Sequence, residues 1–182
     1  ITLVSKYGKP DYFITFTCNP NWLEIKESLY LGQTASDRPD LVARVFNLKL
    51  KALEDMLRKK NVLGEVAAYI WVVEFQKRGL PHCHMLLFMK PEWKPRTTED
   101  VDRVITAELP DRHQDSELYN IVSTTMIHRP CGLLNSQSPC MQNGVCTKKF
   151  PKPFRNDTAM DGDSYPLYRR RNDGRTVTFR EI

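Results

Sequence analysis

The sequence lacks any long apolar run. Its 182 residues contain no apolar stretch of about 18 residues, the length that a membrane-spanning helix requires. We therefore expect no membrane span and no membrane partner. The first residues, Ile-Thr-Leu-Val-Ser-Lys, offer neither an initiator methionine nor the apolar core of a signal peptide, so we expect a piece of a longer protein.

Cysteine is scarce and its number is odd. Five cysteines without a signal sequence do not fit the even-numbered disulfide framework of a small secreted domain. We therefore expect a reducing, intracellular compartment, the cytosol or the nucleus. The chain also lacks internal repeats and low-complexity tracts.

The composition is that of an ordinary soluble globular protein. Hydrophobic residues make up 41% of the chain and charged residues 27%, and a chain of this length can bury an apolar core without staples. The formal net charge of +5 permits an acidic partner such as nucleic acid, without requiring one.

Hydrophobic periodicity predicts an α+β fold, a small antiparallel β-sheet with flanking helices and an irregular Cys-rich C-terminal segment. The expected strands are residues 12–17, 65–75 and 82–89, with 175–180 as a further candidate, and the expected helices are 40–59, 98–109 and 115–127. Asp40 is expected to cap the first helix. Composition changes after residue 127, which predicts a core at 1–127 and a Cys-rich, basic extension at 128–182.

The sharpest motif is His82-Cys83-His84 on the third expected strand. Alternate residues of a strand share a face, so both histidines point to one side and Cys83 to the other. If Glu74 lies opposite either histidine on the neighbouring strand, it joins them on that face, and Gln76 is a weaker candidate. Two imidazoles and a carboxylate suit a catalytic cation better than a closed structural zinc, whereas the alternative is an ordinary half-buried histidine pair.

Three segments resemble a known family. They are residues 13–22 (Phe-Ile-Thr-Phe-Thr-Cys-Asn-Pro-Asn-Trp), 74–84 (Glu-Phe-Gln-Lys-Arg-Gly-Leu-Pro-His-Cys-His) and 126–132 (Met-Ile-His-Arg-Pro-Cys-Gly). Together with Ala-Glu-Leu-Pro at 107–110, they resemble the Helitron helicase-like domain, the Rep-type HUH endonuclease region of rolling-circle transposases.

The resemblance implies a function. His82 and His84 match the metal-binding motif of the family, and Glu74 best matches its carboxylate. The implied cofactor is Mg²⁺ or Mn²⁺, which polarises a phosphodiester of single-stranded DNA for attack by a tyrosine, leaving a 5′-phosphotyrosine intermediate. The implied partners are single-stranded DNA and a superfamily-1 helicase domain in the same polypeptide, and the implied location is the nucleus.

No tyrosine of this sequence matches the nucleophile motif of the family. Tyr165 and Tyr168 flank Pro166, which disfavours a helix, and Tyr119 lacks the accompanying lysines. We therefore assign no catalytic nucleophile within the chain and expect it beyond residue 182.

A second cluster combines one histidine with three cysteines: His128, Cys131, Cys140 and Cys146. One imidazole and three thiolates suffice for a tetrahedral structural Zn²⁺, and the intervening polar residues allow a loop to fold around an ion. The alternative is that the three thiols pack as small apolar groups.

Basic residues form the third group. Candidate contacts to DNA phosphate are Lys77, Arg78, Lys148, Lys149, Arg169, Arg170 and Arg171. Phe150 and Phe154 lie between basic residues, so they either stack on bases or anchor a loop. A solvated surface is the alternative for the charges.

Two other functions remain open from the sequence. One is a catalytically inactive, domesticated module that binds single-stranded DNA or contains zinc. The other is a zinc-containing interaction domain in which the His-x-His spacing is accidental.

Overall fold

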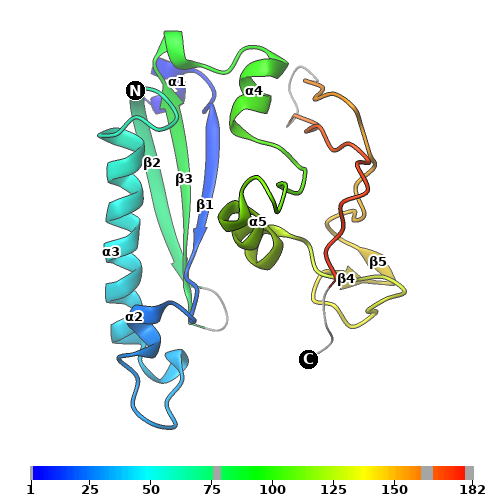
Figure 1. Cartoon of the computed structure of the whole chain (residues 1–182). Coiled ribbons are helices and arrows are strands. Elements are labelled where there is room, and N and C mark those ends of the chain that lie inside the picture. The colour runs from blue at the N-terminus through cyan, green and yellow to red at the C-terminus, as the bar shows by residue number, and fades with distance from the viewer. Residues whose placement is uncertain (1, 76–78, 161–165, 179–182) are drawn as a thin grey trace. The chain divides into compact units, whose positions relative to one another are not determined.

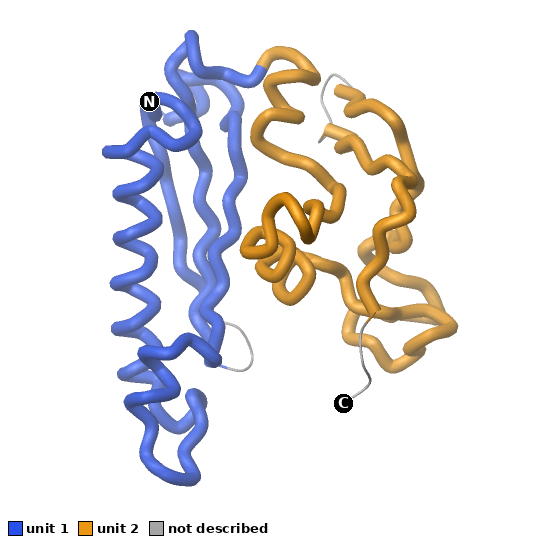
Figure 2. Tube along the Cα trace, viewed as in Figure 1, with its two compact units in different colours: residues 1–95 blue, residues 96–182 orange. Residues whose placement is uncertain are grey.

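The computed structural model describes residues 2–75, 79–160 and 166–178. The chain forms two compact units, Ile1–Pro95 and Arg96–Ile182 (Figure 2). The compact units therefore meet at residues 95–96, whereas composition predicted a boundary after residue 127. The functional division into a nuclease core and an extension stays a prediction.

Unit 1 is a mixed unit with one long helix and a three-stranded sheet (Figure 1). Its elements are α1 (Leu3–Tyr7), β1 (Tyr12–Thr17), α2 (Leu23–Lys26), η1 (Ala35–Asp37), α3 (Pro39–Arg58), β2 (Val66–Phe75), β3 (Pro81–Met89) and η2 (Pro91–Trp93). The sheet is antiparallel in the order β1-β3-β2, so β3 is its middle strand. The three expected strands and the long helix are confirmed.

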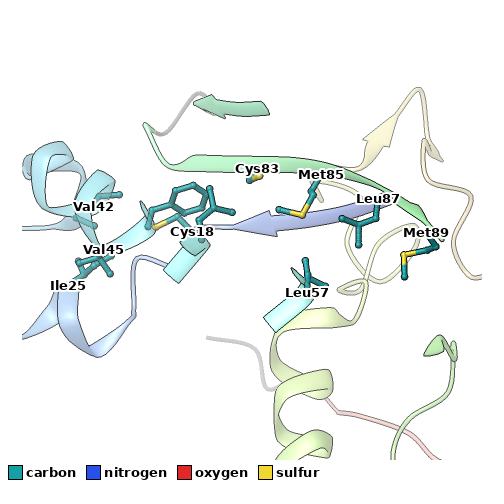
Figure 3. Packing of buried hydrophobic residues seen from close by; sticks show 12 residues of the cluster. Cys18, Ile25, Val42, Val45, Leu57, Cys83, Met85, Leu87 and Met89 are labelled. Carbon is teal, nitrogen blue, oxygen red and sulfur yellow. The ribbon is translucent and has the colours of Figure 1, made fainter. Parts of the chain in front are cut away.

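The core of unit 1 lies between α3 and one face of the sheet. Side chains of α3 spaced three or four residues apart belong to one buried cluster with the odd-numbered side chains of β3. Figure 3 shows Cys83, Met85, Leu87 and Met89 along β3, with Leu57 of α3 on the same side of the strand. The members of this buried cluster that belong to the two elements are Val42, Val45, Phe46, Leu50, Leu57, Cys83, Met85, Leu87 and Met89. Burial raises the pKa of the Cys83 thiol and raises that of Cys18 to about 11, so both thiols are neutral core groups.

The start of α3 corrects one expectation. Arg38, not Asp40, is the N-cap residue, and Pro39 occupies the first turn, where its missing N–H costs nothing. Asp40 lies inside the helix, where its carboxylate accepts two hydrogen bonds from the Arg38 guanidinium at 2.9 and 3.0 Å.

Unit 2 has little regular structure. It contains α4 (Thr98–Val104), α5 (Ser116–Ile121), the π-helical turn η3 (Val122–Met126), β4 (Met141–Gln142) and β5 (Val145–Cys146). The rest of its described residues are turns, isolated bridges and extended chain. The α+β class with an irregular Cys-rich C-terminal segment is confirmed.

Both helices of unit 2 are shorter than predicted. The helix expected at 98–109 ends at Val104, and the backbone N–H of Ala107 instead donates to the carbonyl of Arg169. The helix expected at 115–127 becomes π-helical after Ile121, where the hydroxyls of Thr124 and Thr125 bond to backbone carbonyls one turn back.

The strand expected at 175–180 is absent from residues 175–178, and 179–180 lie outside the described residues. Among the helices of the described chain, none combines the length and the apolar character that crossing a membrane demands.

Candidate metal centres

The first candidate centre is the sheet face opposite α3. On β3, His82 and His84 point to this face, whereas Cys83 between them is fully buried in the core. Glu74 of β2 lies directly opposite His82, the placement that strand alternation required for it to share their face. The expected geometry of the three side chains is therefore present.

The three side chains form an open set. The imidazole centroids of His82 and His84 are 4.5 Å apart, and Glu74 Oε2 lies 3.6 Å from His84 Nε2. The Glu74 side chain is 63% exposed, so its carboxylate can reorient toward a ligand.

Strand β1 supplies contacts to both histidines. Thr17 Oγ1 lies 2.6 Å from His82 Nδ1, and in the tautomer with its proton on Nδ1 the ring donates to this hydroxyl and keeps Nε2 for a metal. The ring of Phe13 stacks on His84 at 5.3 Å between centroids with 13° between the planes. Sequence reasoning missed Thr17 and Phe13 because strand order was not predictable from the pattern. Once β1 lies beside β3, the same alternation identifies both residues.

Electrostatics keep His82 uncharged. Burial lowers its pKa below the usual 6.5, the neighbouring His84 lowers it further, and Glu74 opposes both effects. At neutral pH the imidazole is therefore neutral, which is the form that binds metals. His84 Nδ1 is buried and, within the described residues, has no hydrogen-bond partner.

The surface around the histidines is partly apolar. Phe13 is 50% exposed, and Ile70 and Val72 on β2 are each 52% exposed. Lys77 and Arg78, the predicted phosphate contacts on the hairpin, lie outside the described residues, as does Gln76.

The second candidate centre gathers His128, Cys131, Cys140 and Cys146. Each offers one ligand atom, and these atoms all lie within 4.8 Å of one another. His128 Nε2 is 3.4 Å from Cys140 Sγ and 3.6 Å from Cys146 Sγ. Four residues that the sequence singled out thus converge on one point, and together they can hold a metal such as Zn²⁺.

A tight hairpin presents two of the cysteines. Strands β4 and β5 are joined by Asn143 and Gly144 with φ of 51° and 76°, the left-handed pair that a two-residue hairpin turn requires. Cys140 immediately precedes the hairpin and Cys146 ends it, so the turn brings their sulfurs together.

The thiols differ in acidity. Backbone N–H groups of Phe150 and Lys148 donate to the Cys146 sulfur and lower its pKa, which favours a thiolate. Burial and the two other thiols raise the pKa of Cys131 to about 11. The His128 ring stacks on Phe150 with 4.0 Å between centroids and 9° between planes.

The predicted basic contacts divide into two groups. Arg169 and Arg171 pair with acidic groups of unit 2, Asp102 at 3.0 Å and Glu108 at 2.7 Å respectively. The hydrogen bond from Arg171 holds the pKa of Glu108 at about 2. Arg170 lies over the Phe154 ring and donates to a backbone carbonyl.

Lys148 and Lys149 form the other group. Within the described residues neither has an acidic group at ion-pair distance, and both are exposed. Their role as phosphate contacts stays a prediction.

Unit 1 is thus an α+β unit whose middle strand presents two histidines, beside a carboxylate, on the sheet face that α3 leaves open. Residues 1–87 match the family described as the Helitron helicase-like domain at the N-terminus, which confirms the resemblance over this part of the chain. The match covers β1 and β2 and ends within β3, so residues 107–110 and 126–132 lie beyond it. For residues 1–87 the match indicates a Helitron transposase-related, and hence DNA-related, context. No curated protein matches the chain.

Proposed function

We propose that unit 1 is the metal-binding part of a Rep-type HUH endonuclease, which nicks and rejoins single-stranded DNA during rolling-circle transposition. The observation that carries this proposal is the shared placement of His82, His84 and Glu74 on an open sheet face. It lies within the segment that matches the Helitron family.

The donor set fits a divalent cation of the Mg²⁺ or Mn²⁺ type. His82 and His84 would supply imidazole nitrogens and Glu74 a carboxylate oxygen, and the exposed face leaves positions for water and phosphate. When bound, such an ion supplies Lewis-acid polarisation of the scissile phosphodiester.

The side chains of β1 orient the ligands. The Thr17 hydroxyl holds the His82 ring by its Nδ1, and the Phe13 ring restrains the plane of His84. Because the lowered pKa favours the neutral His82 ring, a metal can bind without first displacing a proton from it.

The apolar surroundings favour an unpaired strand as substrate. Phe13 and Val72 are half exposed beside the histidines, and unstacked bases can lie on such side chains, whereas the bases of a duplex are covered. Single-stranded DNA is therefore the proposed substrate.

The attacking hydroxyl comes from outside the sheet in this proposal. Tyr12 and Tyr69 both lie opposite Leu87, whose side chain is in the core, so they face α3 rather than the histidines. A tyrosine ester to the 5′-phosphate would conserve the energy of the broken bond for rejoining. The protein would act in the nucleus together with a superfamily-1 helicase domain.

A Mn²⁺ titration followed by electron paramagnetic resonance tests the proposal on zinc-replete protein. We expect one site in the wild type and at least tenfold weaker binding in His82→Ala and in Glu74→Ala. His113→Ala, which removes an exposed histidine of unit 2, is the matched control and is expected to bind Mn²⁺ like the wild type.

Equal Mn²⁺ uptake by the wild type and both ligand variants would contradict the proposal. That result would favour the second function, a catalytically inactive module that contains zinc and binds single-stranded DNA. The convergence of His128 with three cysteines is the observation that favours this alternative.

A further inference from the structure

The described residues of unit 2 form almost no apolar core of their own. Among its described residues, the buried side chains are Val101, Ser138, Cys140, Cys146 and Thr158. Two of these belong to the cysteine cluster and two are polar. Unit 1, by contrast, buries one continuous cluster of apolar side chains from α2, η1, α3 and β3. A unit of this size with so little buried apolar area needs another source of stability, such as a disulfide or a metal.

Its regular structure is equally sparse. The two strands β4 and β5 have two residues each, and a lone two-stranded hairpin is marginal in water. All cysteines of unit 2 are free thiols, so no disulfide supplies the missing stability within the described residues.

Two distances within the cluster match those of a filled tetrahedral site. With Zn–S bonds of about 2.3 Å and Zn–N bonds of about 2.0 Å, a tetrahedron places nitrogen and sulfur about 3.5 Å apart. His128 Nε2 lies 3.4 and 3.6 Å from the sulfurs of Cys140 and Cys146. Packed thiols need no such agreement.

We propose that one Zn²⁺ bound by His128 Nε2 and the thiolates of Cys131, Cys140 and Cys146 folds unit 2, in place of an apolar core. On binding, each thiol releases its proton to water as its Zn–S bond forms, so three protons leave for each ion. The resulting site carries one net negative charge, which Arg129 and Lys148, lining the pocket beside His128 and Cys140, partly offset.

Contacts carry the effect of the metal beyond its ligands. The His128 ring stacks on Phe150, and the Lys152 ammonium lies 5.4 Å from the Phe150 ring centroid. The carbonyl of Lys152 accepts a hydrogen bond from Arg170, whose backbone also pairs with Arg155. Loss of the ion is therefore expected to loosen the segments around Lys152 and Arg170 as well as the loop that holds the cluster.

The sequence offers a reporter that separates the two units. All three tryptophans, Trp22, Trp71 and Trp93, lie in unit 1. Tryptophan emission therefore follows unit 1, while trypsin cleavage mapped by mass spectrometry follows unit 2.

The experiment measures zinc in the purified chain by plasma mass spectrometry, then removes it with a strong chelator. We expect about one zinc per chain. After chelation we expect at least tenfold faster trypsin cleavage within residues 96–182, unchanged tryptophan emission, and recovery when zinc is restored. His128→Ala should lose zinc, and His113→Ala, the matched control in the same unit, should keep it.

Cobalt substitution gives a readout that does not depend on a variant that folds. Co²⁺ added to the metal-free wild type should produce the visible bands of a four-coordinate ion and thiolate charge-transfer absorption. Protein without zinc and without these bands would overturn the site. Zinc whose removal leaves unit 2 resistant to trypsin would overturn its role in folding. Neither result bears on the nuclease proposal, which rests on unit 1.

Discussion

Thr17 is not a proposed ligand, but its hydroxyl orients one of the two histidines, His82. Its hydroxyl lies 2.6 Å from His82 Nδ1 and so fixes which ring nitrogen faces a ligand. We predict that Thr17→Val, which keeps the shape and removes the hydroxyl, weakens Mn²⁺ binding about 10–100-fold, the usual cost of losing such a partner. A Mn²⁺ titration by electron paramagnetic resonance measures the change.

Thr15 provides the matched control at the same scale. It lies on the same strand and the same face, opposite His84, and no hydrogen bond joins it to either imidazole in the described structure. Thr15→Val should leave Mn²⁺ affinity unchanged. An equal loss in both variants would show that the hydroxyl of Thr17 has no special role.

The sequence identified the side chains that come together in both candidate centres, but not the residues that contact them. Alternation along one hairpin was enough to place Glu74 with the histidines, and the four members of the His/Cys cluster lie close together in sequence. Thr17 was not predictable because its contact needs the order of the strands. The acidic partners of Arg169 and Arg171 lie more than sixty positions away, so the charges looked free from the sequence.

At the scale of elements, α3 contributes many of the buried side chains that stabilise unit 1. Leu50 belongs to the buried cluster and its side chain is only 2% exposed, whereas Leu48 on the same helix is 67% exposed. We predict that Leu50→Ala lowers the free energy of unfolding by about 2–5 kcal/mol, because it removes buried contacts and leaves a cavity. Urea denaturation followed by tryptophan emission measures it.

Leu48→Ala is the control for this prediction, with an expected change below about 0.5 kcal/mol because surface substitutions rarely exceed that. Similar losses in both variants would mean that α3 does not pack through the stripe that contains Leu50.

Long elements were predictable and short ones were not. The strand at 12–17 has the bounds expected, and α3 differs from its expectation by one residue at each end. Strong periodicity over many residues fixes such elements. The helices of unit 2 were overestimated because hydroxyls of Thr124 and Thr125, and pairing of Ala107 with the tail, compete with helical hydrogen bonds.

At the scale of the whole molecule, only some of the basic side chains are available to bind phosphate. The net charge is +5, yet Arg169 and Arg171 pair with carboxylates of unit 2, whereas Lys148 and Lys149 have no carboxylate partner among the described residues. We predict that Lys148→Ala and Lys149→Ala each weaken binding of a fluorescent oligothymidylate. Each should also reduce the slope of log affinity against log salt by about 0.7, the value of one phosphate contact. Fluorescence anisotropy at several salt concentrations measures both.

Arg171→Ala is the control at this scale. Its guanidinium already neutralises Glu108, so we expect an unchanged salt slope. If the slope fell for Arg171→Ala and not for the lysine variants, the phosphate contact would be assigned to Arg171 instead of to Lys148 and Lys149.

Because β3 is the middle strand of its sheet, the side chains of the His82, His84 and Glu74 set are not held equally firmly. Both histidines belong to a strand with hydrogen-bonded neighbours on either side, whereas Thr17 and Glu74 belong to edge strands. Edge strands open first in local fluctuations, and amide hydrogen exchange slows toward the middle strand. We therefore expect the imidazole pair to keep its spacing through brief openings of the edge strands, so a bound ion would lose the Glu74 carboxylate before the two histidines.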